Sequence, residues 1–391
     1  MIAGVLKETF PGERRVAVVP SALPLLAKAG VQVVLESGAG VSAGFPDALF
    51  TDKGARVVAS RQEVLDAARI VLSVRPLAGV TSGERRGLEG LDGRHVLVGL
   101  LDPLGNPGAI QTLAAAGVTA FALEIIPRIT RAQAMDVLSS AATITGYKAV
   151  LLAANALPQM FPLLMTAGGT LAPARVFVIG AGVAGLQAIA TARRLGAVVQ
   201  SYDVRPAVKE QVESLGARFV ELPLEAGDAQ DRAGYAKAMD ESFYRRQRET
   251  MMKVVAASDV VIATAAVPGK KAPILLTAEM VDAMPPGAVI VDVAAEQGGN
   301  CELTRPGETV SRGAVTILGP LNIASTVPQH ASQMHGRNVA SFLGLLVAGD
   351  EIKIDLTDEI VRETLVTRDG EVVHPRVREA LGLSAPATVS R

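Results

Sequence analysis

The chain has 391 residues, of which 49% are hydrophobic and 20% charged, with a formal net charge of −1 and a single cysteine, Cys301. This charge balance disfavours nucleic acid as a partner, and one cysteine excludes a disulfide framework. The four histidines lack the spacing of a metal-binding motif, so we expect no metal site. The length exceeds that of a usual single core and predicts two domains.

Strand and helix patterns alternate over the first 122 residues. This alternation predicts a parallel sheet with crossover helices. There is no G-x-G-x-x-G motif in this region, so we do not expect it to hold the main nucleotide site. The opening MIAGVLKETF lacks the apolar core of a signal peptide, which favours a cytoplasmic protein. The expected elements are the strands Ile2–Leu6, Val31–Glu36, Arg69–Val74, Val96–Leu101 and Val118–Ala122 and the helices Ser21–Ala29 and Pro107–Ala116.

A long helix is predicted over Ala132–Leu157, joining the first region to the second. The overlapping segment Ala149–Ala174 has no charged residue and is long enough to span a membrane. Pro158 and Pro162 would break a helix there. We therefore expect a buried helix that ends near Leu157, followed by an apolar connection, and no direct membrane insertion.

The stretch from residue 174 to residue 205 combines every component of a dinucleotide-binding unit. Gly180 permits a tight turn, Gly182 lets the backbone approach a pyrophosphate, and Gly185 lets helix and strand pack closely. The N-terminus of the helix attracts phosphate. Asp203 would accept hydrogen bonds from the adenosine ribose and repel a 2′-phosphate, which favours NAD(H) over NADP(H). The flanking elements are the strand Arg175–Ile179, the helix Val183–Leu195 and the strand Val198–Tyr202.

The rest of the chain continues the second domain and then returns to the first. A polar insertion at 223–257 separates its strands; the first half is predicted to be a mobile loop and the second half a helix. The fold class is α/β, with two Rossmann-like doubly wound domains and a cleft between them. The first domain would comprise 1–138 plus 326–391, and the second 139–325 with the mobile loop near 223–240. The expected elements are the strands Phe219–Glu221, Asp259–Thr264, Val289–Val293 and Val315–Leu318, the helix Asn338–Ala348 and a hairpin at Thr364–Val373.

Several strings carry a family resemblance over nearly the whole chain. The most specific are PRITRAQAMDVLSS and GYAKAM, supported by KETFPGERRVAVVP, the glycine-turn unit, AAVPGKKAPILLTAEMV and IVDVAAEQGGN. With them the chain resembles the soluble NAD(H)-binding component of proton-translocating NAD(P) transhydrogenase, which is domain I, the first portion of the alpha subunit. This family lies in the alanine dehydrogenase/transhydrogenase superfamily.

The resemblance implies a set of site residues. Hydride transfer between two nicotinamide C4 atoms needs close approach, orientation and exclusion of water, and no general base. The implied positions are Arg128, Gln133, Asp136 and Ser139 around the nicotinamide, Gly180, Gly182, Val183 and Gly185 at the pyrophosphate, Asp203, Val204 and Arg205 at the adenosine end, Gly234 and Tyr235 on a closing loop, and Thr264, Ala265 and Ala266 on the far side.

The resemblance also implies partners. NADP(H) would be bound by a beta subunit, and proton translocation would need a membrane-embedded subunit. Family members pair as homodimers through this component. Because the chain stops at Arg391 after a polar tail, we expect a separately encoded membrane subunit and a peripheral location on the cytoplasmic face of the membrane.

Two alternatives remain. Alanine dehydrogenase shares the two-domain design and needs a lysine and a histidine facing the nicotinamide. Arg75 and Asp102 stand at those positions, although Arg15 could bind a carboxylate. Retention of RITRAQAMD favours transhydrogenase. The second alternative is a non-enzymatic NAD(H)-binding regulator.

Overall fold

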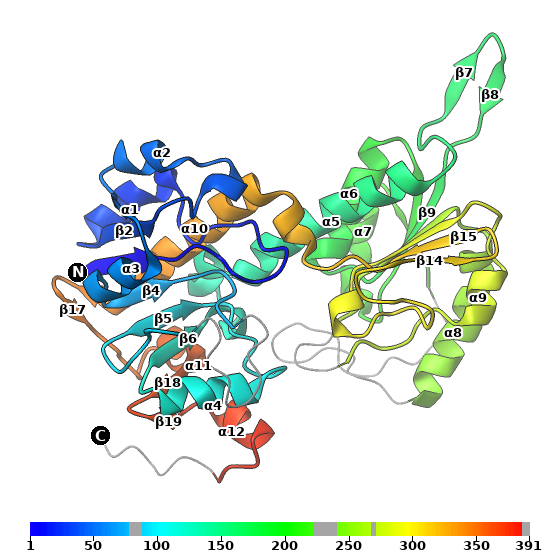
Figure 1. The fold of residues 1–391 in the computed structure, drawn as a ribbon. Helices are drawn as coiled ribbons and strands as arrows, with labels where there is room; N and C mark the ends of the chain where they lie inside the picture. Colours follow the sequence, from blue (N-terminus) through cyan, green and yellow to red (C-terminus); the bar gives the residue numbers. More distant parts are fainter. Residues whose placement is uncertain (78–87, 222–240, 267–270, 385–391) are drawn as a thin grey trace. The chain divides into compact units, whose positions relative to one another are not determined.

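The computed structural model describes residues 1–77, 88–221, 241–266 and 271–384. The chain divides into two compact units: Met1–Ala141 together with Ser325–Arg391 form unit 1, and Ala142–Ala324 form unit 2. Each unit is an α/β domain built on a Rossmann-like sheet (Figure 1), which confirms the predicted α/β class with two Rossmann-like domains. The predicted mobile loop near 223–240 falls outside the described residues.

Unit 1 is built on an eight-stranded sheet. Six strands are parallel in the order β3-β2-β1-β4-β5-β6, and β18 and β19 continue the sheet antiparallel. The strand order reverses between β1 and β4, the place where such sheets form a crevice. The strands are β1 (Ile2–Val5), β2 (Gln32–Glu36), β3 (Arg56–Val58), β4 (Ile70–Leu72), β5 (Val96–Gly99), β6 (Thr119–Ala122), β18 (Leu365–Arg368) and β19 (Glu371–Val372).

The predicted hairpin near the C-terminus is confirmed. Its turn is Asp369-Gly370, and both residues have positive φ values, of 52° and 82°. An Asp-Gly pair adopts this left-handed conformation readily, and the resulting turn matches the twist of the two strands. The returning C-terminal segment thereby joins the sheet of unit 1 through β18, which pairs with β6.

Helices cover both faces of this sheet. Along β4, Ile70 and Leu72 belong to one core cluster and Val71 to another, as expected for a strand buried on both sides. The first cluster includes side chains of α1, α10 and α11, and the second includes those of α3, α4 and α12. The helices are α1 (Leu23–Lys28), α2 (Asp47–Thr51), α3 (Arg61–Ala67), α4 (Pro107–Ala115), α10 (Pro328–Leu346), α11 (Glu359–Thr364) and α12 (Pro375–Ala380), and a small ladder joins β16 (Val347–Ala348) to β17 (Glu351–Ile352).

Unit 2 is built on a seven-stranded sheet in the order β11-β10-β9-β12-β13-β15-β14. All its pairs are parallel except β14 with β15. Here the strand order reverses between β9 and β12. The elements are β9 (Arg175–Ile179), α6 (Val183–Arg194), β10 (Val198–Tyr202), α7 (Lys209–Ser214), β11 (Arg218–Phe219), α8 (Glu241–Ala256), β12 (Val260–Ala263), α9 (Ala278–Asp282), β13 (Val289–Asp292), β14 (Thr309–Arg312) and β15 (Val315–Leu318).

The long helix α5 (Val137–Ala156) begins later than predicted. The preceding residues form the 3-10 helix η4 (Thr130–Met135), and Asp136, at ψ 90°, separates the two. Among the described residues, α5 is one helix whose length and composition would suffice to cross a membrane. Its residues Ala149, Val150 and Ala153 nevertheless lie in a core cluster of unit 2 with side chains of α6 and α7.

The apolar connection predicted after α5 contains regular structure that the sequence did not indicate. It forms a two-stranded hairpin of β7 (Leu164–Thr166) and β8 (Gly169–Leu171) that projects from its unit (Figure 1). The strands are only three residues long and most of their side chains are exposed, so the segment has no strand-like pattern of alternating burial.

Candidate functional site

The glycine turn lies at the point where the strand order of unit 2 reverses. β9 and β12 are parallel neighbours, so their carboxyl ends meet at the same edge of the sheet. Gly180 follows β9 with a φ of +95°, a conformation that favours glycine. Thr264 follows β12, and its hydroxyl donates to the carbonyls of Ile179 and Gly180, both at 3.1 Å. The predicted pyrophosphate and far-side positions are therefore adjacent.

The other two glycines of the motif have different surroundings. A Cβ on Gly185 would lie 1.8 Å from the carbonyl oxygen of Gly180, so only glycine lets α6 start this close to β9. A Cβ on Gly182 would have the Arg205 guanidinium, at 4.0 Å, as its nearest neighbour. Gly182 precedes the first residue of α6, Val183, whose helix N-terminus attracts anions. The turn is thus tightly packed at Gly185 and has open space beside Gly182. A pyrophosphate needs such space to approach the backbone.

Asp203 is held more firmly than the sequence indicates. Its Oδ1 accepts hydrogen bonds from the Arg205 backbone N–H and Nε, both at 2.8 Å. Its Oδ2 accepts from the Ala181 N–H at 2.7 Å and from Arg205 Nη2 at 2.8 Å. A carboxylate offers about four acceptor positions, and these donors fill them. Asp203 therefore fixes the glycine turn through Ala181, and a ribose hydroxyl that bound to this carboxylate would have to replace one of these donors.

This pairing leads to a prediction about nucleotide choice. Asp203→Ala removes the negative charge and releases Arg205 to bind a 2′-phosphate, so NADPH affinity should rise about tenfold. NADH affinity should fall, because the Ala181 N–H loses its acceptor. Titrations of both nucleotides check this. Arg205→Ala, which keeps the carboxylate, should still reject NADPH; equal rejection by Asp203→Ala would contradict the role given to the acid.

Asn300 and Asp292 support the far side of this site and had no assigned role in the sequence. The Asn300 amide accepts from the Ala265 N–H at 3.0 Å and donates to the Ala265 and Pro273 carbonyls at 2.8 and 2.9 Å. Asp292, at the end of β13, accepts from the Asn300 N–H at 2.7 Å and from the Thr304 hydroxyl at 2.6 Å. Both side chains are fully buried. They fix Ala265 and Pro273, which follow Thr264 in the described part of the chain.

The predicted nicotinamide residues lie on and around η4 in unit 1. Gln133 and Arg128 are exposed, whereas Ala132 and Met135 are buried in the core beside α10. Asp136 accepts from the Ser139 N–H and hydroxyl at 2.9 and 2.6 Å, and so caps the start of α5. The structure thus brings Asp136 and Ser139 together and presents Gln133 on a firmly packed turn. Gly234 and Tyr235 lie outside the described residues.

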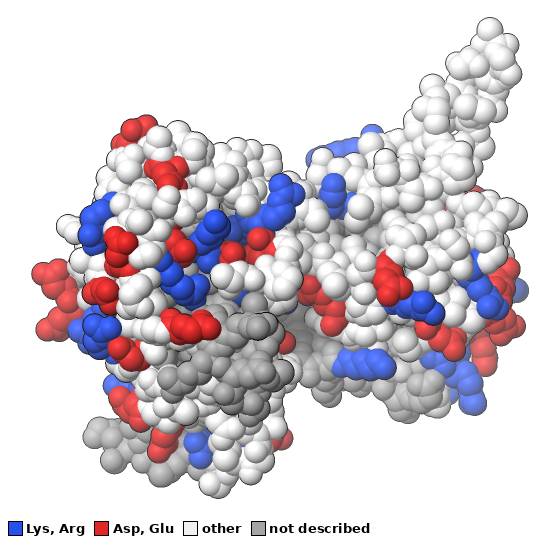
Figure 2. All heavy atoms as spheres, in the orientation of Figure 1, with Lys and Arg blue, Asp and Glu red and all other residues white. Residues whose placement is uncertain are grey.

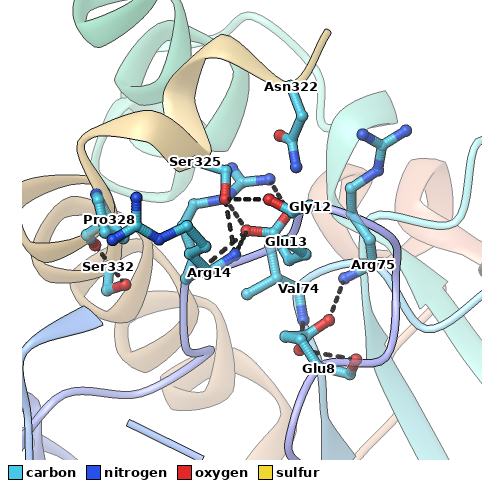
Figure 3. A network of polar contacts seen from close by, with 12 residues as sticks. Glu8, Gly12, Glu13, Arg14, Val74, Arg75, Asn322, Ser325, Pro328 and Ser332 are labelled. Atoms are coloured by element: carbon cyan, nitrogen blue, oxygen red, sulfur yellow. Dashed lines mark hydrogen bonds and ion pairs between the residues drawn. The ribbon is translucent and has the colours of Figure 1, made fainter. Parts of the chain in front are cut away.

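The carboxyl end of β1 in unit 1 corresponds to the end of β9 in unit 2, where the glycine turn lies. At this place in unit 1 the chain positions the carboxylate of Glu8. Glu8 follows β1, and its carboxylate accepts from the backbone N–H groups of Val74 and Arg75 at 2.6 and 3.0 Å and from the Ser73 hydroxyl at 2.9 Å (Figure 3). These groups follow β4, the neighbour of β1. Glu8 thus takes the backbone donors that a phosphate would use at the carboxyl edge of a Rossmann-like sheet.

The partly buried carboxylate of Glu8 gives a pH prediction. Burial raises the pKa of Glu8 from 4.5 to about 7. Between these values the folded protein keeps a proton that the unfolded chain has lost, so Glu8 makes stability fall as pH rises. Relative to wild type, the free energy of unfolding of Glu8→Gln should therefore increase by up to about 3 kcal/mol from pH 4.5 to pH 8. Denaturant unfolding across this range checks the slope; parallel curves for the two proteins would contradict it.

The structure also shows the surroundings of the three residues on which the alanine dehydrogenase alternative depends. The Arg15 guanidinium donates to the Glu13 carboxylate through Nε at 2.8 Å and Nη2 at 2.7 Å, and both side chains are buried. Its charge is thus neutralised within the chain. Arg75 and Asp102 line one small cavity, with the Arg75 guanidinium stacked 3.8 Å above the Phe10 ring. The cavity has an arginine and an aspartate where that reaction needs a lysine and a histidine.

Comparison with known proteins identifies the family of the chain. The N-terminal domain model of the alanine dehydrogenase/PNT family matches residues 4–145, and its C-terminal domain model matches residues 149–375. The chain is 45% identical to the first portion of NAD(P) transhydrogenase subunit alpha of Rhodospirillum rubrum over 96% of this chain and 98% of the relative. It is 29% identical to alanine dehydrogenase of Bacillus subtilis over 98% and 95%.

The fold comparison adds a solved structure. The crystal structure of transhydrogenase from Sinorhizobium meliloti superimposes with a TM-score of 0.84 at 42% identity, covering 95% of this chain and all of the other. Sequence and structure therefore agree: the chain belongs to the alanine dehydrogenase/PNT family, among the relatives of transhydrogenase alpha subunits.

Proposed function

We propose that this chain is the NAD(H)-binding component of a proton-translocating transhydrogenase, working with NADP(H) bound by a partner beta subunit. The observation that carries the proposal is the glycine turn of unit 2, open beside Gly182 and placed where the strand order reverses. The identity to a transhydrogenase alpha subunit supports it. Gly180, Gly182, Val183 and Gly185 would hold the pyrophosphate, and Asp203 to Arg205 the adenosine end.

The nicotinamide would be held by side chains that orient it without removing a proton. In the reaction, a hydrogen with its electron pair leaves C4 of NADH and joins C4 of NADP⁺. Arg128, Gln133, Asp136 and Ser139 suit this step because amide, hydroxyl and charged groups fix the carboxamide and ribose. Gly234 and Tyr235 would lie on the loop that closes over the nucleotide. Orientation and exclusion of water supply the rate.

The chain would complete this reaction only with its partners. One nucleotide site cannot hold donor and acceptor together, so the NADP(H)-binding beta subunit must provide the other half. A membrane-embedded subunit would couple the redox step to proton movement. The chain would then sit as a peripheral subunit on the cytoplasmic face of the membrane.

A mixing experiment tests the proposal. The purified chain, NADH and an NADP⁺ acceptor should give hydride transfer only when the NADP(H)-binding subunit is added. A non-enzymatic regulator would stay silent in the mixture. Formation of NADH from NAD⁺ and L-alanine by the chain alone would instead show alanine dehydrogenase activity, and either result would overturn the proposal.

We also propose that the β7–β8 hairpin pairs two copies of the chain. Five of the large hydrophobic side chains that are exposed in the described residues fall within 147–171, and Met165 at the hairpin is 78% exposed. The projecting hairpin shows no charged side chain in Figure 2. Exposed large apolar side chains concentrated in one segment are typical of an interface. A homodimer would cover it. The five residues are Tyr147, Met160, Leu163, Met165 and Leu171.

A charge placed on this patch should separate the copies. Met165→Asp would bury a carboxylate in the interface, so the mass measured by light scattering should fall from dimer to monomer. Leu25→Asp, at an exposed position on α1 of unit 1, serves as the control and should remain dimeric. A wild-type monomer, or a dimeric Met165→Asp, would contradict the assignment.

A further inference from the structure

The η4 turn is attached at two points to the C-terminal segment that returns to unit 1. Arg131 donates to Asp358 through both terminal nitrogens, Nη1 to Oδ2 at 2.6 Å and Nη2 to Oδ1 at 2.7 Å. Asn338, on α10, donates from Nδ2 to the carbonyl of Ala134 at 2.8 Å. These partners are 227 and 204 residues apart in the chain. The turn is therefore held by groups from a distant segment.

The two attachments flank the exposed side chain of Gln133. The buried side chains of Ala132 and Met135 fix the same short turn from beneath. Contacts on both sides of Gln133 thus fix the turn from which this exposed amide projects. Such rigid support is what a group that orients a reacting ring requires.

We propose that Arg131, Asp358 and Asn338 are positioning residues that hold η4 so that Gln133 meets the nicotinamide in the geometry for hydride transfer. This inference rests on the proposed function. It gives the return of the C-terminal segment to unit 1 a role beyond completing the sheet.

Asp358 is itself anchored. It precedes α11, and its Oδ1 accepts from the Ile360 N–H at 2.9 Å, which caps that helix. The hydrogen bond from Arg131 lowers the pKa of Asp358 to about 2, so the carboxylate is ionised at neutral pH. The Arg131 side chain is half exposed. One end of the contact is thus fixed to a helix, and the other end holds the turn.

Removal of the Arg131–Asp358 ion pair should have different effects on rate and stability if the pair has a positioning role than if it has only a structural role. An ion pair this exposed contributes little to folding, so the thermal midpoint should move by no more than about 3 °C. A displacement of the turn by about 1 Å can nevertheless reduce the rate of a reaction about 100-fold. Loss of rate without loss of stability is therefore the expected signature.

The experiment measures hydride transfer in the mixture with the NADP(H)-binding subunit. Asp358→Asn keeps an acceptor for the helix cap but removes the charge, and should lower the transfer rate about tenfold with KM for NADH within about twofold. Arg131→Ala should lower the transfer rate by a similar factor, and Arg131→Lys should recover some of that rate. The isotope effect with C4-deuterated NADH should rise, because the transfer step becomes more limiting. Asn338→Leu, which removes the donor to Ala134 without burying a charge, should change the rate in the same direction.

Unit 2 offers a matched control. Arg312 donates to Asp282 through Nε and Nη2 at 2.7 and 2.8 Å, with both side chains about half exposed. Arg312→Ala should leave rate and isotope effect unchanged. Rates for the Arg131, Asp358 and Asn338 variants equal to this control, or losses that follow the thermal midpoint, would overturn the inference. Absence of transfer in the wild-type mixture would instead refute the proposed function.

Discussion

Gly185→Ala is expected to abolish NADH binding and to destabilise unit 2 by about 3 kcal/mol or more. The added Cβ would lie 1.8 Å from the Gly180 carbonyl oxygen and 2.8 Å from its carbon. The clash is with backbone, so no side chain can rotate to relieve it. Gly180 cannot easily retreat, because its φ of +95° is required by the turn and the Thr264 hydroxyl binds its carbonyl. Denaturant unfolding and NADH titration measure the two effects.

Gly182→Ala provides the contrasting variant. Its Cβ would have its nearest neighbour, the Arg205 guanidinium, at 4.0 Å, so the fold should remain intact. A pyrophosphate lying against the Gly182 backbone would meet that methyl group, and NADH affinity should fall about tenfold or more. A folded Gly182→Ala with wild-type affinity would place the pyrophosphate elsewhere. A Gly185→Ala protein as stable as wild type would refute the packing argument.

The nucleotide-binding unit was predictable because local signals agree with the global fold there. The strands β9 and β10 have the predicted bounds, and α6 ends one residue before the predicted Leu195. β-branched runs, a glycine turn and an amphipathic helix all favour the same structure over a short stretch. The same consistency identified the Asp369-Gly370 hairpin.

Elsewhere the deciding contacts are not local. The predicted helix from Ala132 starts only at Val137, because Asp136 caps α5 and the preceding residues pack as a 3-10 turn beneath α10. Nothing near Asn300 in the sequence shows that its amide joins Ala265 to Pro273. Such roles arise when segments far apart in the chain meet, and a single sequence carries no signal of them.

Asp203 lies where the sequence predicts it, after the second strand of the unit, but its hydrogen bonds within the protein were not predicted. Arg205 lies only two residues later and binds the carboxylate through its backbone and its guanidinium. Rejection of a 2′-phosphate would then rest on the Asp203 carboxylate, which also binds the Arg205 guanidinium. This makes Arg205 the residue to hold constant when Asp203 is changed.

Gln133→Ala is expected to slow hydride transfer about 100-fold while NADH affinity stays within about threefold. The side chain is exposed on a turn that is fixed by buried neighbours, so its removal leaves the fold intact and takes away one orienting amide. Most binding energy would come from unit 2, where we propose the pyrophosphate and adenosine contacts. The loss should therefore appear in the transfer step. Single-turnover kinetics with the partner subunit and a fluorescence titration of NADH separate the two quantities.

Thr130→Ala is the matched control, because Thr130 is exposed on the same turn and has no assigned contact with nucleotide. It should transfer hydride at the wild-type rate. Asp136 needs a more careful substitution, since its oxygens cap α5 through Ser139. Asp136→Asn keeps a cap acceptor and should slow transfer, whereas Asp136→Ala would also loosen the helix start. If Gln133→Ala instead weakened NADH binding in proportion to the rate, Gln133 would hold the nucleotide in the ground state only, and orientation for transfer would have to come from other residues of the turn.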